Sequence, residues 1–225
     1  MRLQPDRPLR WLACLALVTA VTARAQNVEN GKDVYGPCAA CHGANGEGGK
    51  GGEYPRLAGQ PPSFTIASLK AFQERRRHNL PMFPYTEPRE LPEKDMVDVA
   101  EYLASIELPS NAPEFKDTDS ALDRLLALEK VLIVPRVEGD VEKGKATYQA
   151  KCAKCHGETG GGRDTKGAPL LVGQYPDYLL RRMQALKKDA QTKKGDDAMN
   201  GALDNLAVAD FTDVLAWLTS IQGEQ

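Results

Sequence analysis

The sequence has few metal-binding residues and no apolar run long enough to cross a membrane. It contains five cysteines and three histidines among 225 residues. Its longest apolar stretch, residues 11–23, is shorter than the roughly 20 residues that a membrane-spanning helix needs. Neither sign of charge dominates, because 29 basic side chains stand against 31 acidic ones. Nucleic-acid binding usually requires a strongly basic surface, so we expect that this protein binds no nucleic acid. Because no apolar run is long enough to cross a membrane, we also expect it to be soluble.

The N-terminal segment has the pattern of a secretory signal peptide. Arginines at positions 2, 7 and 10 precede the apolar run, which ends in the small-residue cleavage pattern Ala23-Arg24-Ala25. We predict that residues 1–25 are removed near Ala25 and that the remainder is exported to the periplasm. A retained N-terminal anchor is the alternative. Cys14 lies within this segment and would leave with it.

The other four cysteines form two copies of Cys-x-x-Cys-His, 114 positions apart. This pentapeptide is the attachment motif of c-type haem. Two thiols at this spacing can form thioethers with the two vinyl groups of one porphyrin, and the histidine that follows can bind its iron. We therefore predict two covalently bound haem c groups, each held by two thioethers and one axial imidazole: Cys38, Cys41 and His42 for the first, and Cys152, Cys155 and His156 for the second.

Two other uses of the four thiols remain open at this point. Export to an oxidising compartment permits disulfides of the thioredoxin kind within each Cys-x-x-Cys pair. A zinc site with four thiolate ligands is the second possibility. Both leave the histidine after each pair unexplained, and no βαβ pattern accompanies the motifs. The haem interpretation is favoured.

An internal duplication extends beyond the cysteine motifs. A shift of 114 residues places Pro55-Arg56-Leu57-Ala58-Gly59-Gln60 on Pro169-Leu170-Leu171-Val172-Gly173-Gln174. A repeat of this length is a duplicated domain rather than a short solenoid unit. We predict an N-terminal domain over residues 26–107, a linker over 108–138 and a C-terminal domain over 139–225.

Each domain reads as a small helical unit. Short helices are expected before the motifs, around Val28–Gly36 and Val141–Lys151. A middle helix follows in each unit, with Ser63 or Asp177 placed as its N-cap. The last helix has an apolar stripe at helical spacing, and no segment alternates as strands do. The sequence predicts an all-α fold of two tandem domains, each wrapped around a haem that supplies the centre of its core.

The linker contains one further predicted helix, within Ser120–Leu132. We expect this helix to pack between the two domains. A docking surface for another protein is the alternative.

The second axial ligands are sought among four methionines. A methionine opposite histidine is usual when a haem transfers electrons. Met96 and Met183 lie on apolar helix faces and are interpreted as core residues. Met82 and Met199 lie in proline-rich and polar loops, so we assign Met82 to the first iron and Met199 to the second. His78 is a rival ligand for the first iron.

Pro55 and Pro169 are candidates for a supporting role. A histidine that binds a metal usually donates its other ring N–H to a nearby acceptor. The carbonyl groups of these two prolines follow the motifs at equal distances. We predict that they accept the free N–H groups of His42 and His156.

The tandem motifs, the repeated Pro-x-Leu-x-Gly-Gln, the loop methionines and the closing aromatic helices resemble the dihaem cytochromes of the c4 type. The resemblance covers nearly all of residues 26–225. It implies two cytochrome c domains related by a pseudo-twofold axis, with haems close enough to exchange electrons. It also implies His42/Met82 and His156/Met199 ligation, with Pro55 and Pro169 supporting the histidines. The linker is longer than in that family.

These features predict an electron carrier rather than an enzyme. Each haem would take a single electron, because six-coordinate iron leaves no open position for a substrate. The expected partners are an electron-donor protein and an electron-acceptor protein, with docking at membrane complexes as one possibility. We expect the protein itself to be a monomer or a homodimer. One alternative is an electron-transfer subunit of a larger periplasmic oxidoreductase. Another is catalysis at haem, such as peroxide reduction, which requires loss of a methionine ligand.

Overall fold

A computed structural model describes residues 28–192, 199 and 201–223, so the predicted signal peptide lies outside it. In the described part, all regular elements are helical, and strand-like pairing is limited to two isolated bridges, Gly49 with Tyr54 and Arg163 with Ala168. The all-α prediction is confirmed. None of the helices in these ranges has the length and apolar character needed to span a membrane.

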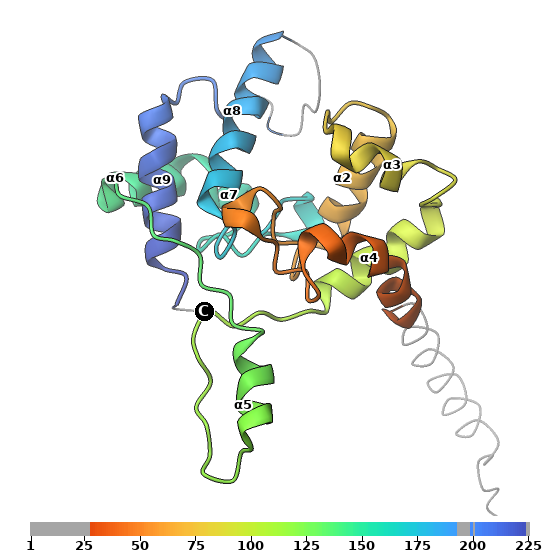
Figure 1. The fold of residues 1–225 in the computed structure, drawn as a ribbon. Coiled ribbons are helices and arrows are strands. Elements are labelled where there is room, and N and C mark those ends of the chain that lie inside the picture. The colour runs from red at the N-terminus through yellow and green to blue at the C-terminus, as the bar shows by residue number, and fades with distance from the viewer. Residues whose placement is uncertain (1–27, 193–198, 200, 224–225) are drawn as a thin grey trace, which may run out of the picture.

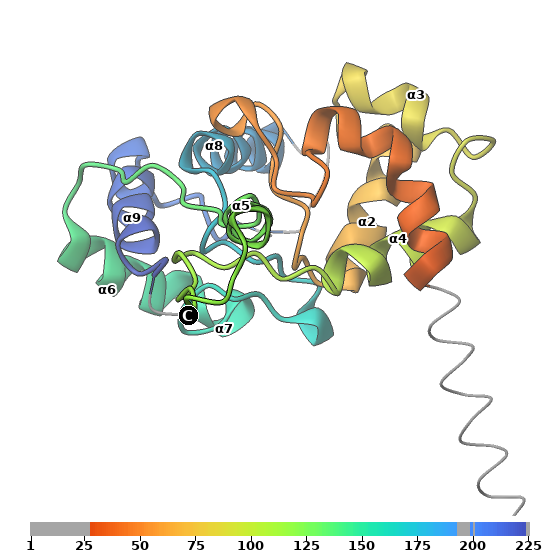
Figure 2. The ribbon, with the colours of Figure 1, turned by 60° about the horizontal axis from the view of Figure 1, so that its bottom comes forward.

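The helices form two units with a projecting arm between them in the sequence (Figures 1 and 2). The first unit contains a helix over residues 28–42, then η1 (Lys50–Gly52), α2 (Pro62–Gln73), η2 (Leu80–Met82), α3 (Phe83–Thr86) and α4 (Glu93–Ala104). The linker carries α5 (Ala121–Leu128). The second unit contains α6 (Val141–Lys151), α7 (Ala153–His156), η3 (Asp164–Lys166), α8 (Pro176–Thr192) and α9 (Val208–Ser220).

The first and last helices of each unit cross at a glycine. A Cβ atom on Gly31 would lie 2.0 Å from the backbone oxygen of Asp98 in α4. A Cβ atom on Gly144 would lie 1.9 Å from the backbone oxygen of Asp213 in α9. Real side chains do not approach backbone this closely, so only glycine permits the two helices to touch at these points.

The apolar stripes of α4 and α9 face aromatic residues of the first helices. In the first unit, Tyr35 packs with buried Val99 and Leu103. In the second, Tyr148 packs against Trp217, with ring centroids 4.5 Å apart. These contacts join the two ends of each unit and leave the Cys-x-x-Cys-His motif beside the core.

Three predictions about helix ends were wrong. The first helix does not end at Gly36 but continues through the first motif to His42. Helix α2 begins at Pro62, so Ser63 lies inside it and Pro61 occupies the N-cap position. Helix α8 begins at Pro176, which places Asp177 in its first turn rather than at its N-cap. Proline is well suited to the first helical position because it lacks an N–H. Both helices therefore begin at a proline, earlier in the sequence than predicted.

The base of the linker is tied to both units. Leu108, Leu132 and Val134 form a buried cluster with Ala58 of the first unit, and Tyr175 of the second packs against it. The Gln222 side chain also accepts from Val134 N–H at 3.0 Å and donates to its carbonyl at 2.9 Å.

The linker helix itself projects from the body, contrary to the prediction that it packs between the domains. Helix α5 begins with a capping box between Ser120 and Asp123. It runs along the projecting arm, from the turn at its tip back toward the two units (Figure 1). Its leucines are solvent-exposed: Leu122 by 62%, Leu125 by 54%, Leu126 by 47% and Leu128 by 44%. The helical pattern was real, but its apolar side has no cover within this chain's described residues.

Candidate haem-binding sites

The first motif ends the helix of residues 28–42. Cys38 and Cys41 lie in its last turns, and His42 is its final residue, before Gly43 with φ of +82°. The His42 ring is 6% exposed, and its Nδ1 lies 2.9 Å from the carbonyl oxygen of Pro55. The pairing predicted between these two residues is thus present in the structure.

The second motif repeats this geometry on a broken helix. Helix α6 ends at Lys151, Cys152 lies at the break, and α7 carries the chain to His156. His156 is 5% exposed, with its Nδ1 3.0 Å from the carbonyl oxygen of Pro169. The two units therefore present the same histidine in the same environment.

The proline carbonyls fix the proton on each imidazole. A carbonyl oxygen can only accept, so Nδ1 of each ring must be the donor and Nε2 is left with a free electron pair. Burial lowers the pKa of His42 and of His156, an effect that the bond to proline partly offsets. Both rings are neutral at pH 7 and have the form that binds iron.

The four thiols are unpaired in the structure, which shows no disulfide among them. Burial raises the pKa of the Cys38 thiol, and it raises that of Cys152 to about 11. In the described part of the chain, no three His, Cys, Asp or Glu side chains are grouped so that they could hold a metal ion, which disfavours the zinc alternative. The donor set of each motif fits a haem c.

The glycine-rich loops after the motifs are also duplicated. Tyr35 donates its hydroxyl to the Gly43 carbonyl at 2.6 Å, and Tyr148 donates to the Gly157 carbonyl at 2.7 Å. The His42 carbonyl accepts from Gly48 N–H at 2.7 Å, as that of His156 does from Gly162 at 2.9 Å. These bonds fix the backbone on the C-terminal side of each histidine.

The methionines lie on other elements. Met82 is half-buried at the end of η2, where its carbonyl accepts from the Thr86 hydroxyl at 3.2 Å. Met199 is half-buried and packs against the apolar cluster of Leu203, Leu206 and Phe211. Met96 is 1% exposed in α4, as expected of a core residue. Ligation by Met82 and Met199 stays a prediction.

The rival ligand and the arginines that precede it have other contacts. His78 is exposed, and its ring packs edge-on against Phe83 at 5.5 Å. Arg75 pairs with Glu87, and Arg77 donates to the Tyr178 hydroxyl at 2.7 Å across the two units. The arginine run thus holds loops and the interface together.

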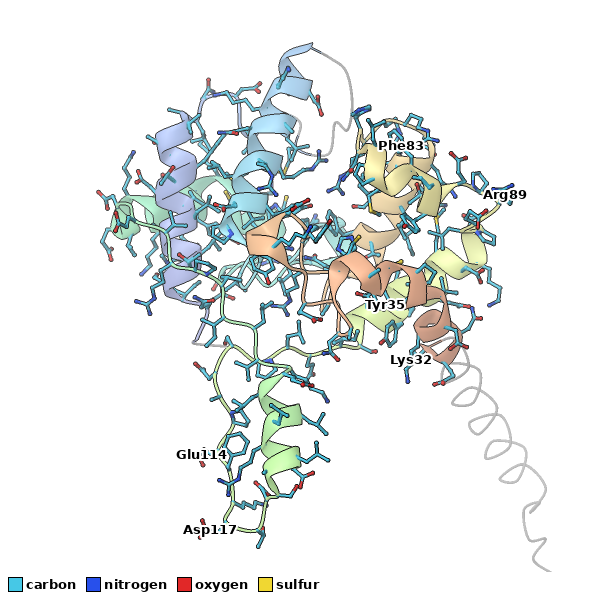
Figure 3. The ribbon with its side chains drawn as sticks, in the orientation of Figure 1. Lys32, Tyr35, Phe83, Arg89, Glu114 and Asp117 are labelled. Atoms are coloured by element: carbon cyan, nitrogen blue, oxygen red, sulfur yellow. The ribbon has the colours of Figure 1, made fainter. Side chains whose placement is uncertain are left out.

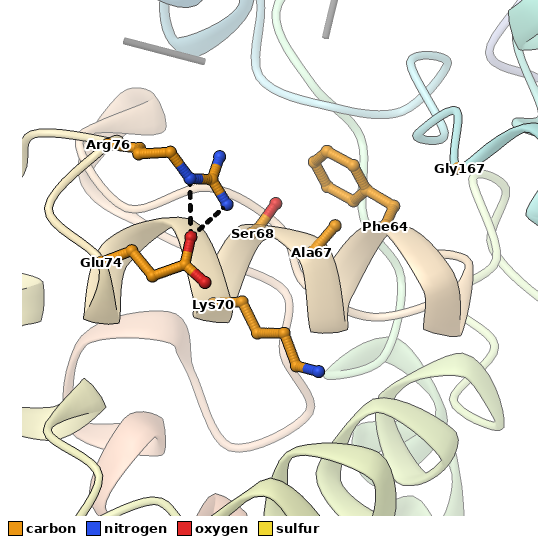
Figure 4. Close-up of a pocket in the computed structure, with 7 residues that line it drawn as sticks. All are labelled: Phe64, Ala67, Ser68, Lys70, Glu74, Arg76 and Gly167. Carbon is orange, nitrogen blue, oxygen red and sulfur yellow. Dashed lines mark hydrogen bonds and ion pairs between the residues drawn. The ribbon is translucent and has the colours of Figure 1, made fainter. Parts of the chain in front are cut away.

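One surface hollow of about 270 Å³ lies along α2 (Figure 4). Its lining includes Phe64, Ser68 and Gly167, with the ion pair between Arg76 and Glu74 at one end. None of the lining residues belongs to a Cys-x-x-Cys-His motif or is a candidate axial methionine. The hollow carries no functional assignment.

The sequence reasoning missed what the repeated glutamines do. Gln60 donates to the Leu170 carbonyl at 3.2 Å and accepts from its N–H at 3.1 Å. Gln174 holds Arg56 in the same way, at 2.8 and 2.9 Å. The repetition of glutamine in both copies was the available signal. Each glutamine holds the residue next to the proline that orients the other unit's histidine.

The two structural repeats coincide with matches to one protein family. The family model for cytochrome c matches residues 28–107 and again residues 141–222. The chain belongs to the cytochrome c family, and it carries two covalently bound haem c groups.

The tandem arrangement is that of a dihaem cytochrome of the c4 type. Cytochrome c4 of Thiocapsa roseopersicina is 28% identical over 171 residues, covering 75% of this chain and 79% of that protein. The crystal structure of reduced cytochrome c4 from Pseudomonas stutzeri matches 85% of this chain and 97% of its own, with a TM-score of 0.63 and 21% identity. The chain is an electron carrier of this type, not an enzyme.

A third similar structure is a larger protein. Thiosulfate dehydrogenase from Marichromatium purpuratum matches 86% of this chain at 25% identity and a TM-score of 0.58. This chain covers 40% of that one.

Proposed function

We propose that the protein is a periplasmic electron carrier in which His42 and Met82 ligate the first iron, and His156 and Met199 the second. When bound, each haem supplies a one-electron couple between ferric and ferrous iron. The residues of this chain bind and orient the two haems and set their potentials. The cofactor is held by Cys38, Cys41, Cys152 and Cys155, with Pro55 and Pro169 orienting the histidines.

The duplicated contact from histidine to proline carries this proposal. Both imidazoles are buried and neutral, with one nitrogen committed to a proline carbonyl and the other left for iron. Methionine opposite histidine gives the higher potentials used in electron transfer. The arginine-rich start, the apolar run and the Ala-x-Ala site support export. The partners would be an electron-donor protein and an electron-acceptor protein. The carrier itself would be a monomer or a homodimer.

An optical redox titration of the purified mature protein tests the assignment. Two closed His/Met centres give the weak long-wavelength band of methionine-bound ferric haem at a strength matching two haems. Neither ferrous haem then binds carbon monoxide. Carbon monoxide binding at one haem would show that its iron has an open coordination position. Catalysis at that haem would then be the function to test. Mass spectrometry of the exported protein tests cleavage after Ala25.

A second candidate function is that of an electron-transfer subunit in a larger periplasmic oxidoreductase. The projecting arm favours it, because four exposed leucines on one short helix form a larger apolar patch than isolated surface residues do. Two acidic side chains, Glu114 and Asp117, lie on the same arm (Figure 3). The similarity to a thiosulfate dehydrogenase that is much longer than this chain points the same way.

Leu125→Glu and Val208→Glu separate the two functions. Both replace an exposed apolar side chain on a helix, at 54% and 53% exposure, but only Leu125 lies on the arm. A subunit copurifies with one stoichiometric partner from its native source, and Leu125→Glu abolishes this while Val208→Glu does not. A free carrier elutes alone in all three forms.

A further inference from the structure

The segment that carries Met82 packs against helix α2. Residues 79–91 form this methionine segment, which contains η2 and α3. Met82 ends η2, and Phe83 directly after it begins α3, which lies beside α2 (Figures 1 and 3). The buried Thr86 hydroxyl donates to the Met82 carbonyl at 3.2 Å. The backbone at Met82 is therefore coupled to the position of α3.

Arg75 contacts α3 at both of its ends. The guanidinium carbon of Arg75 lies 3.8 Å from the centroid of the Phe83 ring. The same guanidinium pairs with the carboxylate of Glu87, the residue just after α3. The ring of His78 also packs edge-on against Phe83, with centroids 5.5 Å apart. The residues that follow α2 thus hold the residue next to Met82.

The backbone at Arg75 has a conformation that favours glycine. Helix α2 ends at Gln73, and Arg75 two residues later has φ of +58°. Glycine is usual in this left-handed position after a helix, because a Cβ atom there crowds the backbone. Apart from Lys50, no other non-glycine residue in the described ranges has a positive φ. Such strain persists where surrounding contacts over-determine it, and it gathers at functional sites.

The second unit repeats one contact of this region but not the turn. In the first unit, the Gln73 side chain donates to the Leu91 carbonyl at 3.0 Å. Its counterpart Lys187 donates to the Leu206 carbonyl in the second unit. Helix α8 continues past Lys187, however, whereas α2 ends at Gln73. The position that corresponds to Arg75 therefore lies within a helix, so the strained turn is a feature of the first unit.

We propose that Arg75 is a positioning residue that holds Met82 at the first iron and slows its dissociation. The inference rests on the proposed ligation of that iron by Met82. A ligand carried by a short segment leaves the iron only when the segment opens locally, so contacts that hold the segment slow the opening. Arg75 acts through Phe83 and Glu87, by a cation–π contact and an ion pair.

Cyanide binding to the ferric dihaem protein tests this role. The carbon of cyanide bonds to iron as the bond from the methionine sulfur breaks, with no change in oxidation state. Arg75→Gly removes the side chain and suits the backbone, since glycine adopts positive φ without strain. Arg75→Leu keeps the Cβ atom and removes the charge. Arg89→Leu is the matched control, because the Arg89 side chain is 87% exposed and pairs with the neighbouring Glu90 (Figure 3).

We expect Arg75→Gly and Arg75→Leu to speed cyanide binding at the first haem about tenfold, from the loss of one cation–π contact and one half-exposed ion pair. Met82→Leu identifies the phase that belongs to this haem, since its first iron has no methionine to displace. The second haem keeps its rate in all variants, and Arg89→Leu keeps both rates. Arg75→Gly should also keep or raise the melting temperature, because it relieves the strained turn.

Two results would overturn the role of Arg75: a wild-type rate in Arg75→Gly, or an equal acceleration in Arg89→Leu. A merely structural residue would change the melting temperature of Arg75→Gly without changing the cyanide rate. If Arg75→Leu does not fold, Arg75→Gly decides. A full-strength methionine band in Met82→Leu would instead refute the ligation by Met82, and this inference with it.

Discussion

The Gln174 side chain bonds to both backbone polar groups of Arg56, although the two residues are 118 positions apart. Its amide oxygen accepts from the Arg56 N–H at 2.9 Å, and its amide nitrogen donates to the Arg56 carbonyl at 2.8 Å. Gln60 makes the equivalent pair of bonds with Leu170. These reciprocal contacts join the units through the segments that orient the histidines.

Gln174→Leu should loosen this interface. The substitution leaves the N–H and carbonyl of Arg56 unsatisfied, and each buried unpaired group costs about 1–3 kcal/mol. We expect a clear fall in the melting temperature of the dihaem protein. Gln149→Leu is the control, because its amide donates to the Glu158 carbonyl in an exposed setting. Equal melting temperatures for the two variants would contradict the role of the interface bond.

Met82→Leu should remove the sixth ligand of the first haem. The ferric protein then keeps half of its methionine band, the ferrous protein binds one carbon monoxide, and the potential of the first haem falls, because a methionine ligand raises it. Met96→Leu is the matched control in a buried helix position. A swap of similar volume there costs less than about 1.5 kcal/mol and leaves both bands. An intact band in Met82→Leu would exclude Met82 as a ligand.

Asp164 supplies a helix cap across the units. Its carboxylate accepts from Ser63 N–H at 2.8 Å in the first turn of α2, and its backbone carbonyl accepts from the Ser63 hydroxyl at 2.7 Å. Bonds from Ser63 lower the pKa of Asp164. Its contribution to stability is therefore present above the unfolded pKa, near 3.9, and is lost as the pH falls through the lower folded value.

Asp164→Ala tests this sign. The mostly exposed carboxylate should contribute about 0.5 kcal/mol, the low end for an N-cap. The difference in melting temperature between wild type and Asp164→Ala stays constant from neutral pH to about pH 5 and disappears in acid below the folded pKa. Asp117→Ala on the arm (Figure 3) should show no such difference. A difference in melting temperature that grows as the pH falls would contradict the lowered pKa of Asp164.

Gly31 and Gly36 lie in one helix and should respond oppositely to alanine. A Cβ at Gly31 collides with the Asp98 carbonyl, whereas a Cβ at Gly36 meets no atom within 4 Å. Gly31→Ala should lower the free energy of unfolding by about 1–3 kcal/mol or more, as overpacking typically does. Gly36→Ala should be neutral or stabilising by up to about 1 kcal/mol. Thermal unfolding of both variants checks the crossing of the first helix with α4. Equal melting temperatures would rule out this close contact.

The local chemistry of this protein was readable from its sequence. The Cys-x-x-Cys-His spacing is set by the porphyrin, and the repeat of 114 residues doubles it. The contact of His42 with Pro55 was predictable because a ligating imidazole needs an acceptor for its second nitrogen, and the motif and proline recur together. Helical periodicity gave the apolar stripes of α4 and α9.

The tertiary structure decided what lies between the repeats. Arg56, Gln60 and Gln174 become an interface only when the two units meet, and no local pattern specifies which segment a glutamine will bond. The leucines of α5 have the periodicity of a buried helix, yet the fold leaves them exposed, since periodicity defines a helix face without defining what covers it. The sequence thus determined the haem chemistry and the helices, because both depend on close neighbours in the chain. The assembly of the two units depended on contacts more than 100 residues apart.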